Sequence, residues 1–222
     1  MENFIFNGIS SEELGIIIKK MPPIIKPAKN IETIKVNGRN GNLHIDNGTY
    51  DSVNITIECV VKDLSKIDII KSVLEGSGKL QLSTVPNRTF DATIKNQIDF
   101  SKYLTVLREF PLILELEPFS YSEVKELNYS ESSSFLIGGN VKTYPVLSIT
   151  GVGSFSINNV SVEVLETEIT IDCDLMNCTN NNIDKNNMVI LDDFPYLNPG
   201  ENTLTLGNGI INVKIEYVER WL

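Results

Sequence analysis

The sequence predicts a mainly β protein of two domains: an N-terminal β-rich domain that carries one helix, and a C-terminal antiparallel β-sandwich. Three observations predict this fold class. Apolar and polar residues alternate with a period of two along most of the chain, as they do in half-buried strands. Only one segment has the apolar spacing of a helix. Formal charge is also divided unevenly: residues 1–125 carry 15 basic and 16 acidic side chains, a net of −1, whereas residues 126–222 carry 4 and 13, a net of −9.

Length and composition limit the classes of protein that fit. A chain of 222 residues with 41% hydrophobic and 22% charged residues is typical of a globular protein with one or two domains. The net charge of −10 argues against a nucleic-acid surface, which needs clustered Lys and Arg. No apolar run approaches the roughly 18 residues that span a bilayer, and the start lacks the basic region of a signal peptide. We therefore expect no membrane insertion and synthesis in a cytoplasm.

The first part of the N-terminal domain predicts a meander of three strands over residues 31–61. Apolar residues alternate in three runs, at 34–36, 43–45 and 53–59. The turn sequence Asn37-Gly38-Arg39-Asn40-Gly41 separates the first two runs, and Asp46-Asn47-Gly48-Thr49 precedes the third. Because Asn-Gly pairs readily adopt positive φ, both turns favour tight hairpins.

One helix is predicted near residues 63–75, with Asp63 as its N-cap and Gly76 at its end. Alternation resumes at residues 90–94 and 98–100, and a further strand at 110–116 is expected to end at Pro118. The domain is assigned residues 1–125.

The remaining chain predicts a polar connection followed by the sandwich. Residues 126–142 are Ser-rich and contain Gly138-Gly139, which indicates a linker or domain-crossing segment, although residues 135–137 could pair as a short strand. About seven short alternating runs then follow in residues 143–222, with turns between several of them and no helical pattern. This spacing is typical of a β-sandwich.

A search for chemistry predicts no catalytic, cofactor or metal site. His44 is the only histidine and lies in an expected strand, where a solvated side chain is the simplest interpretation. Gly76-Ser77-Gly78-Lys79 lacks the preceding Gly and the following Ser or Thr of a phosphate-binding loop. Asp172, Asp174 and the Asp192-Asp193 pair lack a calcium-loop spacing. We therefore expect the protein not to be an enzyme. The free thiol of Cys59 shares a face with apolar residues and is expected to be buried.

Several short motifs, in order and spacing, resemble the distal tail proteins of long, flexible-tailed bacteriophages, the siphoviruses. The hairpin sequence at residues 37–41 resembles the Gly-Arg-Asn/Asp-Gly hairpin of that family. Together the motifs span nearly the whole chain. They lie at residues 4–16, 34–43, 73–80, 98–100, 118–121, 143–149 and 193–202.

The resemblance implies a structural role at the virion tail tip, after assembly in the host bacterial cytoplasm. Members of that family form a homohexameric ring through the N-terminal domain, and their C-terminal domain is a galectin-like sandwich. The ring joins the tail tube to the baseplate or host-adhesion device and leaves a channel for DNA. The implied partners are further copies of the chain, the tail tube protein, a baseplate hub or tail-associated protein, and a receptor-binding protein.

The hairpin Asn37, Gly38, Arg39, Asn40 and Gly41 is the predicted interface, with contacts to a neighbouring subunit or to the next ring. The alternative is an exposed turn in which these residues serve only turn geometry. Three other functions stay open: a carbohydrate-binding sandwich module, another tail-tube or baseplate hub subunit, and a hydrolase that uses paired carboxylates. A cluster of exposed aromatics at one edge of the sandwich would favour the first of these.

Overall fold

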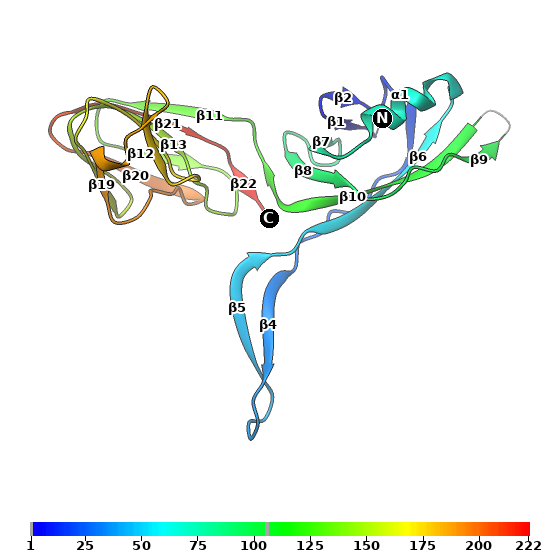
Figure 1. Cartoon of the computed structure of the whole chain (residues 1–222), viewed down its shortest axis with the longest axis horizontal. Helices are drawn as coiled ribbons and strands as arrows, with labels where there is room; N and C mark the ends of the chain where they lie inside the picture. Colours follow the sequence, from blue (N-terminus) through cyan, green and yellow to red (C-terminus); the bar gives the residue numbers. More distant parts are fainter. Residues whose placement is uncertain (1, 105–106) are drawn as a thin grey trace. The chain divides into compact units, whose positions relative to one another are not determined.

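The computed structural model describes residues 2–104 and 107–222 (Figure 1). The chain divides into two compact units, one formed by Met1–Ser120 with Leu222 and the other by Tyr121–Trp221. Strands dominate both units, which confirms the predicted mainly β class. The division falls within a few residues of the predicted boundary at 125. Within the described residues, no helix is long and apolar enough to cross a membrane.

The N-terminal unit is built on one antiparallel sheet whose main strands follow the order β2-β1-β7-β8-β10-β6-β3, with β9 also paired to β10. The long strand β10 organises this sheet, because β6 pairs with it over nine consecutive residues, from Arg108↔Val61 to Leu116↔Val53. The strands are β1 (Phe4–Phe6), β2 (Ile9–Ser10), β3 (Ile16–Lys20), β6 (Val53–Val61), β7 (Ser77–Leu82), β8 (Thr89–Ile94), β9 (Ser101–Leu104) and β10 (Leu107–Tyr121).

The predicted helix is present as a 3₁₀ turn, Leu64–Lys66, that continues into α1, Ile67–Val73. Asp63 is the N-cap, since its carboxylate accepts a hydrogen bond from the backbone N–H of Ser65. Ile70 of α1 is fully buried in the core of this unit, together with the inward side chains of the sheet. The largest fully buried members of that core are Phe4, Phe6, Ile57, Ile70, Leu80, Phe110, Leu112 and Leu114.

The predicted three-stranded meander over residues 31–61 is wrong. The strands β4 (Lys29–Lys35) and β5 (Asn42–Tyr50) pair with each other in a separate two-stranded sheet. The third predicted strand, at residues 53–59, corresponds to β6, whose partners are β10 and β3. Local alternation does not specify which strands pair, and the partners of β6 come from distant parts of the sequence.

Strand β10 also runs past Pro118, where the sequence predicted an end. Its pairing with β6 stops at Leu116↔Val53. The missing N–H of Pro118 therefore removes no bond from that ladder, and the strand tolerates the proline.

The C-terminal unit is an antiparallel β-sandwich, as predicted. One sheet has the order β11-β21-β13-β16-β17-β18 and the other β12-β20-β14-β15-β19. A single core lies between them and includes Leu147, Phe155, Ile171 and Val213. The strands of the two sheets are β11 (Lys125–Tyr129), β12 (Ser133–Ile137), β13 (Val146–Gly151), β14 (Gly153–Ile157), β15 (Val160–Val164), β16 (Glu168–Asp172), β17 (Asn177–Asn180), β18 (Ile183–Asp184), β19 (Val189–Leu191), β20 (Gly200–Leu206) and β21 (Ile210–Tyr217). The short strand β22 (Arg220–Trp221) follows and belongs to neither of these sheets; it pairs with β10.

The segment 126–142, expected to be a linker, instead supplies an edge strand to each sheet. Strand β11 pairs with β21, and β12 pairs with β20. The pairing that the sequence allowed for residues 135–137 is thus present, with Phe135 and Ile137 buried. This short alternation is hard to detect in the sequence, because Leu136 occupies an outward position of β12 and is 75% exposed.

The first and last segments of the C-terminal unit are hydrogen-bonded to each other. The Ser122 N–H donates to the Glu219 carbonyl over 3.0 Å, and the Glu219 N–H donates to Ser122 Oγ over 2.9 Å. The Glu219 carboxylate, whose side chain is only 12% exposed, accepts hydrogen bonds from Gly138 N and Lys125 Nζ. These contacts close the unit without a disulfide, since all three cysteines are free.

Candidate interaction site

The β4–β5 ribbon exposes an apolar face. Residues that lie directly opposite each other on paired antiparallel strands project to the same side. The pairs Ile34↔Leu43 and Glu32↔Ile45 therefore share one face. Leu43 is 36% exposed and Ile45 is 40% exposed, and neither Ile34 nor these two belongs to the core of the N-terminal unit. Figure 1 shows β4 and β5 as a ribbon separate from the main sheet of that unit.

The opposite face of the ribbon is mainly polar. Thr33 pairs with His44, and their side chains are hydrogen-bonded at 3.2 Å. Lys35 pairs with Asn42 on the same side. His44 is therefore solvated in a strand, as the sequence indicated. A two-stranded ribbon with one apolar and one polar face is suited to lie on another apolar surface.

The predicted interface residues Asn37–Gly41 form the exposed tip of this ribbon. The Arg39 N–H donates to the Val36 carbonyl over 3.2 Å, and Gly38 has a φ of +83°. Turn geometry thus accounts for the glycine. A contact of Arg39 with another chain remains a prediction.

The base of the ribbon is anchored to the N-terminal unit. The ring of Tyr50 packs edge-on against Phe119 of β10 with 5.9 Å between centroids. The Asp51 N–H donates to the Ala28 carbonyl over 2.9 Å. Lys29 forms an ion pair with Asp46. The hydrogen bond with Asp46 raises the pKa of Lys29, and the same bond lowers the pKa of Asp46. The contact between Tyr50 and Phe119 fixes the point at which the ribbon leaves the unit, and the other two contacts close the base of the ribbon.

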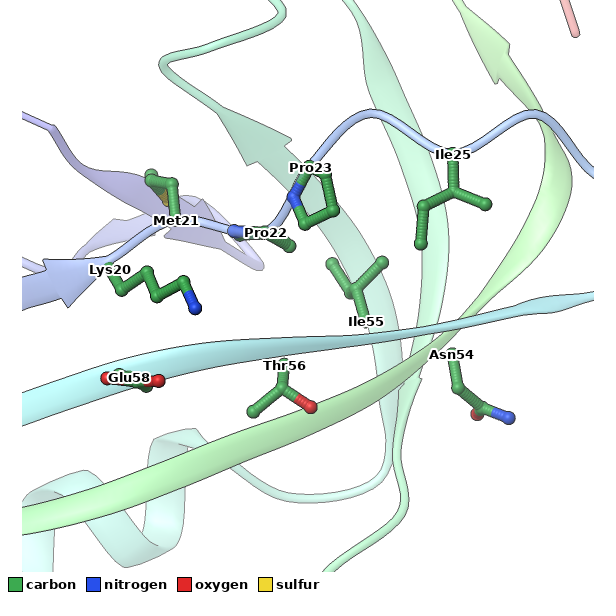
Figure 2. Close-up of a pocket in the computed structure, with 9 residues that line it drawn as sticks. All are labelled: Lys20, Met21, Pro22, Pro23, Ile25, Asn54, Ile55, Thr56 and Glu58. Atoms are coloured by element: carbon green, nitrogen blue, oxygen red, sulfur yellow. The ribbon is translucent and has the colours of Figure 1, made fainter.

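A groove of about 270 Å³ lies beside β6 in the same unit (Figure 2). Strand β3 pairs with the C-terminal half of β6, and that pairing ends at Lys20↔Glu58. The chain then separates from β6, and the groove lies between the two. Its lining consists of Lys20, Met21, Pro22, Pro23 and Ile25 on one side and Asn54, Ile55, Thr56 and Glu58 of β6 on the other.

The alternation of apolar and polar residues does not indicate this groove, although Pro22 and Pro23 are a usable signal in the sequence. Proline has no N–H to donate to a sheet ladder, so pairing with β6 cannot continue through these two residues. Among the described residues, no strand pairs with Val53–Ile57 on the side opposite β10. The N-terminal half of β6 is therefore an open sheet edge.

The residues considered for chemistry do not assemble into a reactive site. Among the described residues, no group of three or more His, Cys, Asp or Glu is placed to hold a metal ion. Asp172 instead holds a turn, because its carboxylate accepts from the N–H groups of Asp174 and Leu175. Gly78 lies in β7, where the Asn7 side chain accepts from Lys79 N over 2.9 Å. Cys59 is fully buried, and burial raises its pKa to about 12.

Two aromatic residues of the sandwich meet in neighbouring loops. The rings of Tyr144 and Tyr196 pack edge-on at 6.5 Å, and both are partly exposed. Lys142 Nζ lies 5.2 Å from the first ring centroid and 4.9 Å from the second. Backbone hydrogen bonds between Thr143 and Leu197 hold the two loops together. Phe155 and Tyr217 are core residues, so the aromatic cluster is small.

The sandwich is similar to the C-terminal domain of a family of phage tail components. Residues 138–221 match the family described as "Siphovirus-type tail component, C-terminal domain". No curated protein sequence matches the chain significantly.

A solved structure extends the likeness to the whole chain. It is the SPP1 Dit (gp 19.1) protein, described as a paradigm of the hub adsorption apparatus in phages that infect Gram-positive bacteria. The match has a TM-score of 0.80 and 11% sequence identity, and it covers 100% of both chains. At this identity the likeness establishes the fold. The family match and the structural match together support the resemblance to siphovirus distal tail proteins that the motifs indicated.

Proposed function

We propose that the protein is a structural, non-catalytic component of a siphovirus tail tip that assembles into a homohexameric ring. The single observation that carries the proposal is the apolar face of the β4–β5 ribbon, with Leu43 and Ile45 exposed in one copy. Soluble proteins rarely leave such faces uncovered unless another molecule binds them. Further copies of the same chain are the partner that the family resemblance implies.

The distribution of charge supports a ring formed by the N-terminal unit. In a symmetric assembly each surface meets a copy of the same chain, so excess charge of one sign is repeated at every interface. Residues 1–125 have a net charge of −1, which limits this repulsion. Residues 126–222 have a net charge of −9, which suits a solvated position outside the ring.

Within the virion, the ring would join the tail tube protein on one side and a baseplate hub or tail-associated protein on the other. The opening of the ring would let DNA pass without sequence-specific contacts, in keeping with the net charge of −10. The C-terminal sandwich would face outward and could carry a receptor-binding protein. Assembly would take place in the cytoplasm of the host bacterium.

Electron microscopy of the purified, negatively stained protein tests this proposal. Six-fold rings with a central opening are expected. Fields of single particles at all concentrations, or open filaments in place of closed rings, would refute a ring-forming role.

A second function, saccharide binding by the C-terminal unit, is favoured by one observation. Tyr144 and Tyr196 present partly exposed rings in adjacent loops, and sugars stack on such rings. A glycan array probed with wild type and Tyr196→Ala tests it. Binding that is lost in the variant would support this function, and an array without signal would exclude it for the glycans presented.

A further inference from the structure

This inference rests on the proposed ring and names the surface that receives the ribbon. We propose that the groove beside β6 binds the β4–β5 ribbon of a second copy of the chain by strand addition. One wall of that groove is formed by Lys20, Met21, Pro22, Pro23 and Ile25, and the other by Asn54, Ile55, Thr56 and Glu58 of β6 (Figure 2).

The backbone of β6 provides the first argument. Along Val53–Ile57, β6 pairs with β10 on one side only. Alternate residues on the other side therefore present N–H and C=O groups to the groove, which makes this edge a template for another strand. A ribbon offers an outer edge of the same kind on each of its two strands, so an added ribbon would satisfy both sets of backbone groups.

The side-chain pattern provides the second argument. Ile55 and Ile57 of β6 point into the core, whereas Asn54, Thr56 and Glu58 lie on the other face. The ribbon has the same division between an apolar and a polar face. Placed edge to edge with β6, its apolar face would continue the buried face of the sheet, and its polar face would continue the face of Thr56.

Charge suits the contact between ribbon and groove, and the geometry of the ribbon base favours a second copy as the donor. On the polar faces, Lys35 of the ribbon is complementary to Glu58 of the groove. A ribbon that folded back onto its own groove would have to reverse direction where Tyr50 packs on Phe119 and Asp51 bonds to Ala28. A ribbon from a neighbouring copy keeps these anchors.

A pair of adjacent isoleucines tests the groove by mutation. Ile25 lines the groove and is 47% exposed, whereas Ile24 is 79% exposed and lies outside the lining. Ile25→Glu is expected to weaken assembly at least tenfold, because it introduces a charge into the apolar contact. The matched variant Ile24→Glu is expected to assemble like wild type. Equal assembly of wild type, I25E and I24E into rings would overturn the acceptor groove while the proposed ring stands.

Cross-linking between two species of the chain identifies the occupant. One species carries Thr56→Cys, and a tagged second species carries His44→Cys, so that each cysteine lies on a polar face. The native cysteines are buried and should not react. With a short bis-maleimide, a covalent heterodimer is expected from the mixed rings. A control species carries Ser161→Cys, at an exposed position of the sandwich, in place of Thr56→Cys, and should give no covalent heterodimer.

The remaining outcomes each decide the proposal. Rings that give no heterodimer would overturn the groove but not the ring. When one chain carries both cysteines, a link confined within that chain would show that the ribbon occupies its own groove, which contradicts a second copy as donor. A wild-type protein that stays monomeric would refute the ring and this inference together.

Discussion

Ile34 of β4 lies directly opposite Leu43 of β5, and the two side chains share a face of the ribbon without joining the core of their unit. Pairs of this kind normally stabilise a sheet by packing against a second layer. Here the described structure of one chain provides no such layer for the ribbon. The pair therefore connects the fold to the proposed assembly, since a neighbouring copy would supply the missing layer.

Leu43→Glu is predicted to weaken assembly while the chain still folds. Full burial of a leucine side chain contributes about 1.5–3 kcal/mol, which corresponds to a change of roughly tenfold to a hundredfold in the dissociation constant of each interface. Sedimentation velocity over a range of concentrations measures the shift.

His44→Glu is the matched control, because His44 is adjacent in sequence but lies on the polar face. Its assembly is expected to stay within a few-fold of wild type. Equal effects of the two substitutions would contradict an apolar contact at this face.

Gly209→Ala is predicted to destabilise the C-terminal unit more than Gly200→Ala. The two glycines have nearly the same φ, +94° and +93°, so both variants pay the cost of a left-handed backbone, about 1–2 kcal/mol. A Cβ on Gly209 would also lie 2.1 Å from the Val152 carbonyl oxygen, whereas one on Gly200 would meet nothing within 4 Å. We expect a further loss of about 1–3 kcal/mol for the first variant.

Urea unfolding followed by the fluorescence of Trp221, the single tryptophan, measures this difference within the C-terminal unit. Equal unfolding midpoints for the two variants would contradict the prediction, because they would mean that the backbone at Val152 moves away from a Cβ on residue 209 at little cost.

The C-terminal unit is predicted to lose stability in acid, because protonation of Glu219 removes its ionic contacts. Burial alone would raise the pKa of its carboxyl, but the Lys125 ammonium and the Gly138 N–H outweigh burial and hold the pKa below its usual value. A lowered folded pKa gives stability that is complete above the unfolded pKa of about 4.3 and is lost as pH falls through the folded value.

Glu219→Gln should therefore lower the free energy of unfolding by about 1.5–3 kcal/mol near neutral pH, the scale of a hydrogen bond to a charged group. The difference from wild type should disappear as pH falls through the folded pKa of Glu219, because the carboxyl is then protonated in both states. Unfolding curves over this pH range test the prediction. A difference that does not change with pH would point to packing in place of charge.

The three cysteines are predicted to resist thiol reagents in the folded protein. Burial raises the pKa to about 12 for Cys59 and Cys173 and to about 11 for Cys178. The thiolate is the reactive form, so almost none is present near neutral pH. Titration with a chromogenic disulfide reagent should find three thiols in denaturant and none within minutes in buffer. A thiol that reacts rapidly in buffer would indicate local opening of its strand.

The sequence predicted where the strands of this fold lie better than it predicted which strands pair and which faces are buried. Ile34 and Leu43 alternate with polar residues as Ile55 and Ile57 do, yet the first pair is exposed and the second is buried. Alternation reports that one face is apolar, and burial depends on partners elsewhere in the chain. For β6 the partner β10 lies about fifty residues away, beyond any local pattern.

The candidate site shows the same limit. The turn residues 37–41 identified the tip of the ribbon, because positive φ restricts residue type locally. The groove depends on two segments, Lys20–Ile25 and Asn54–Glu58, that come together only in the folded unit. The proline pair in the first segment shows that pairing must stop there, but not which strand edge is left open.

Native mass spectrometry of the purified full-length chain tests the central claim of self-assembly most directly. A chain of 24.8 kDa is expected to give a dominant species of about 149 kDa, six times that mass, in wild type and in H44E. Leu43→Glu should shift the population toward the single chain. A dominant wild-type species at 24.8 kDa over the whole concentration range would contradict the account.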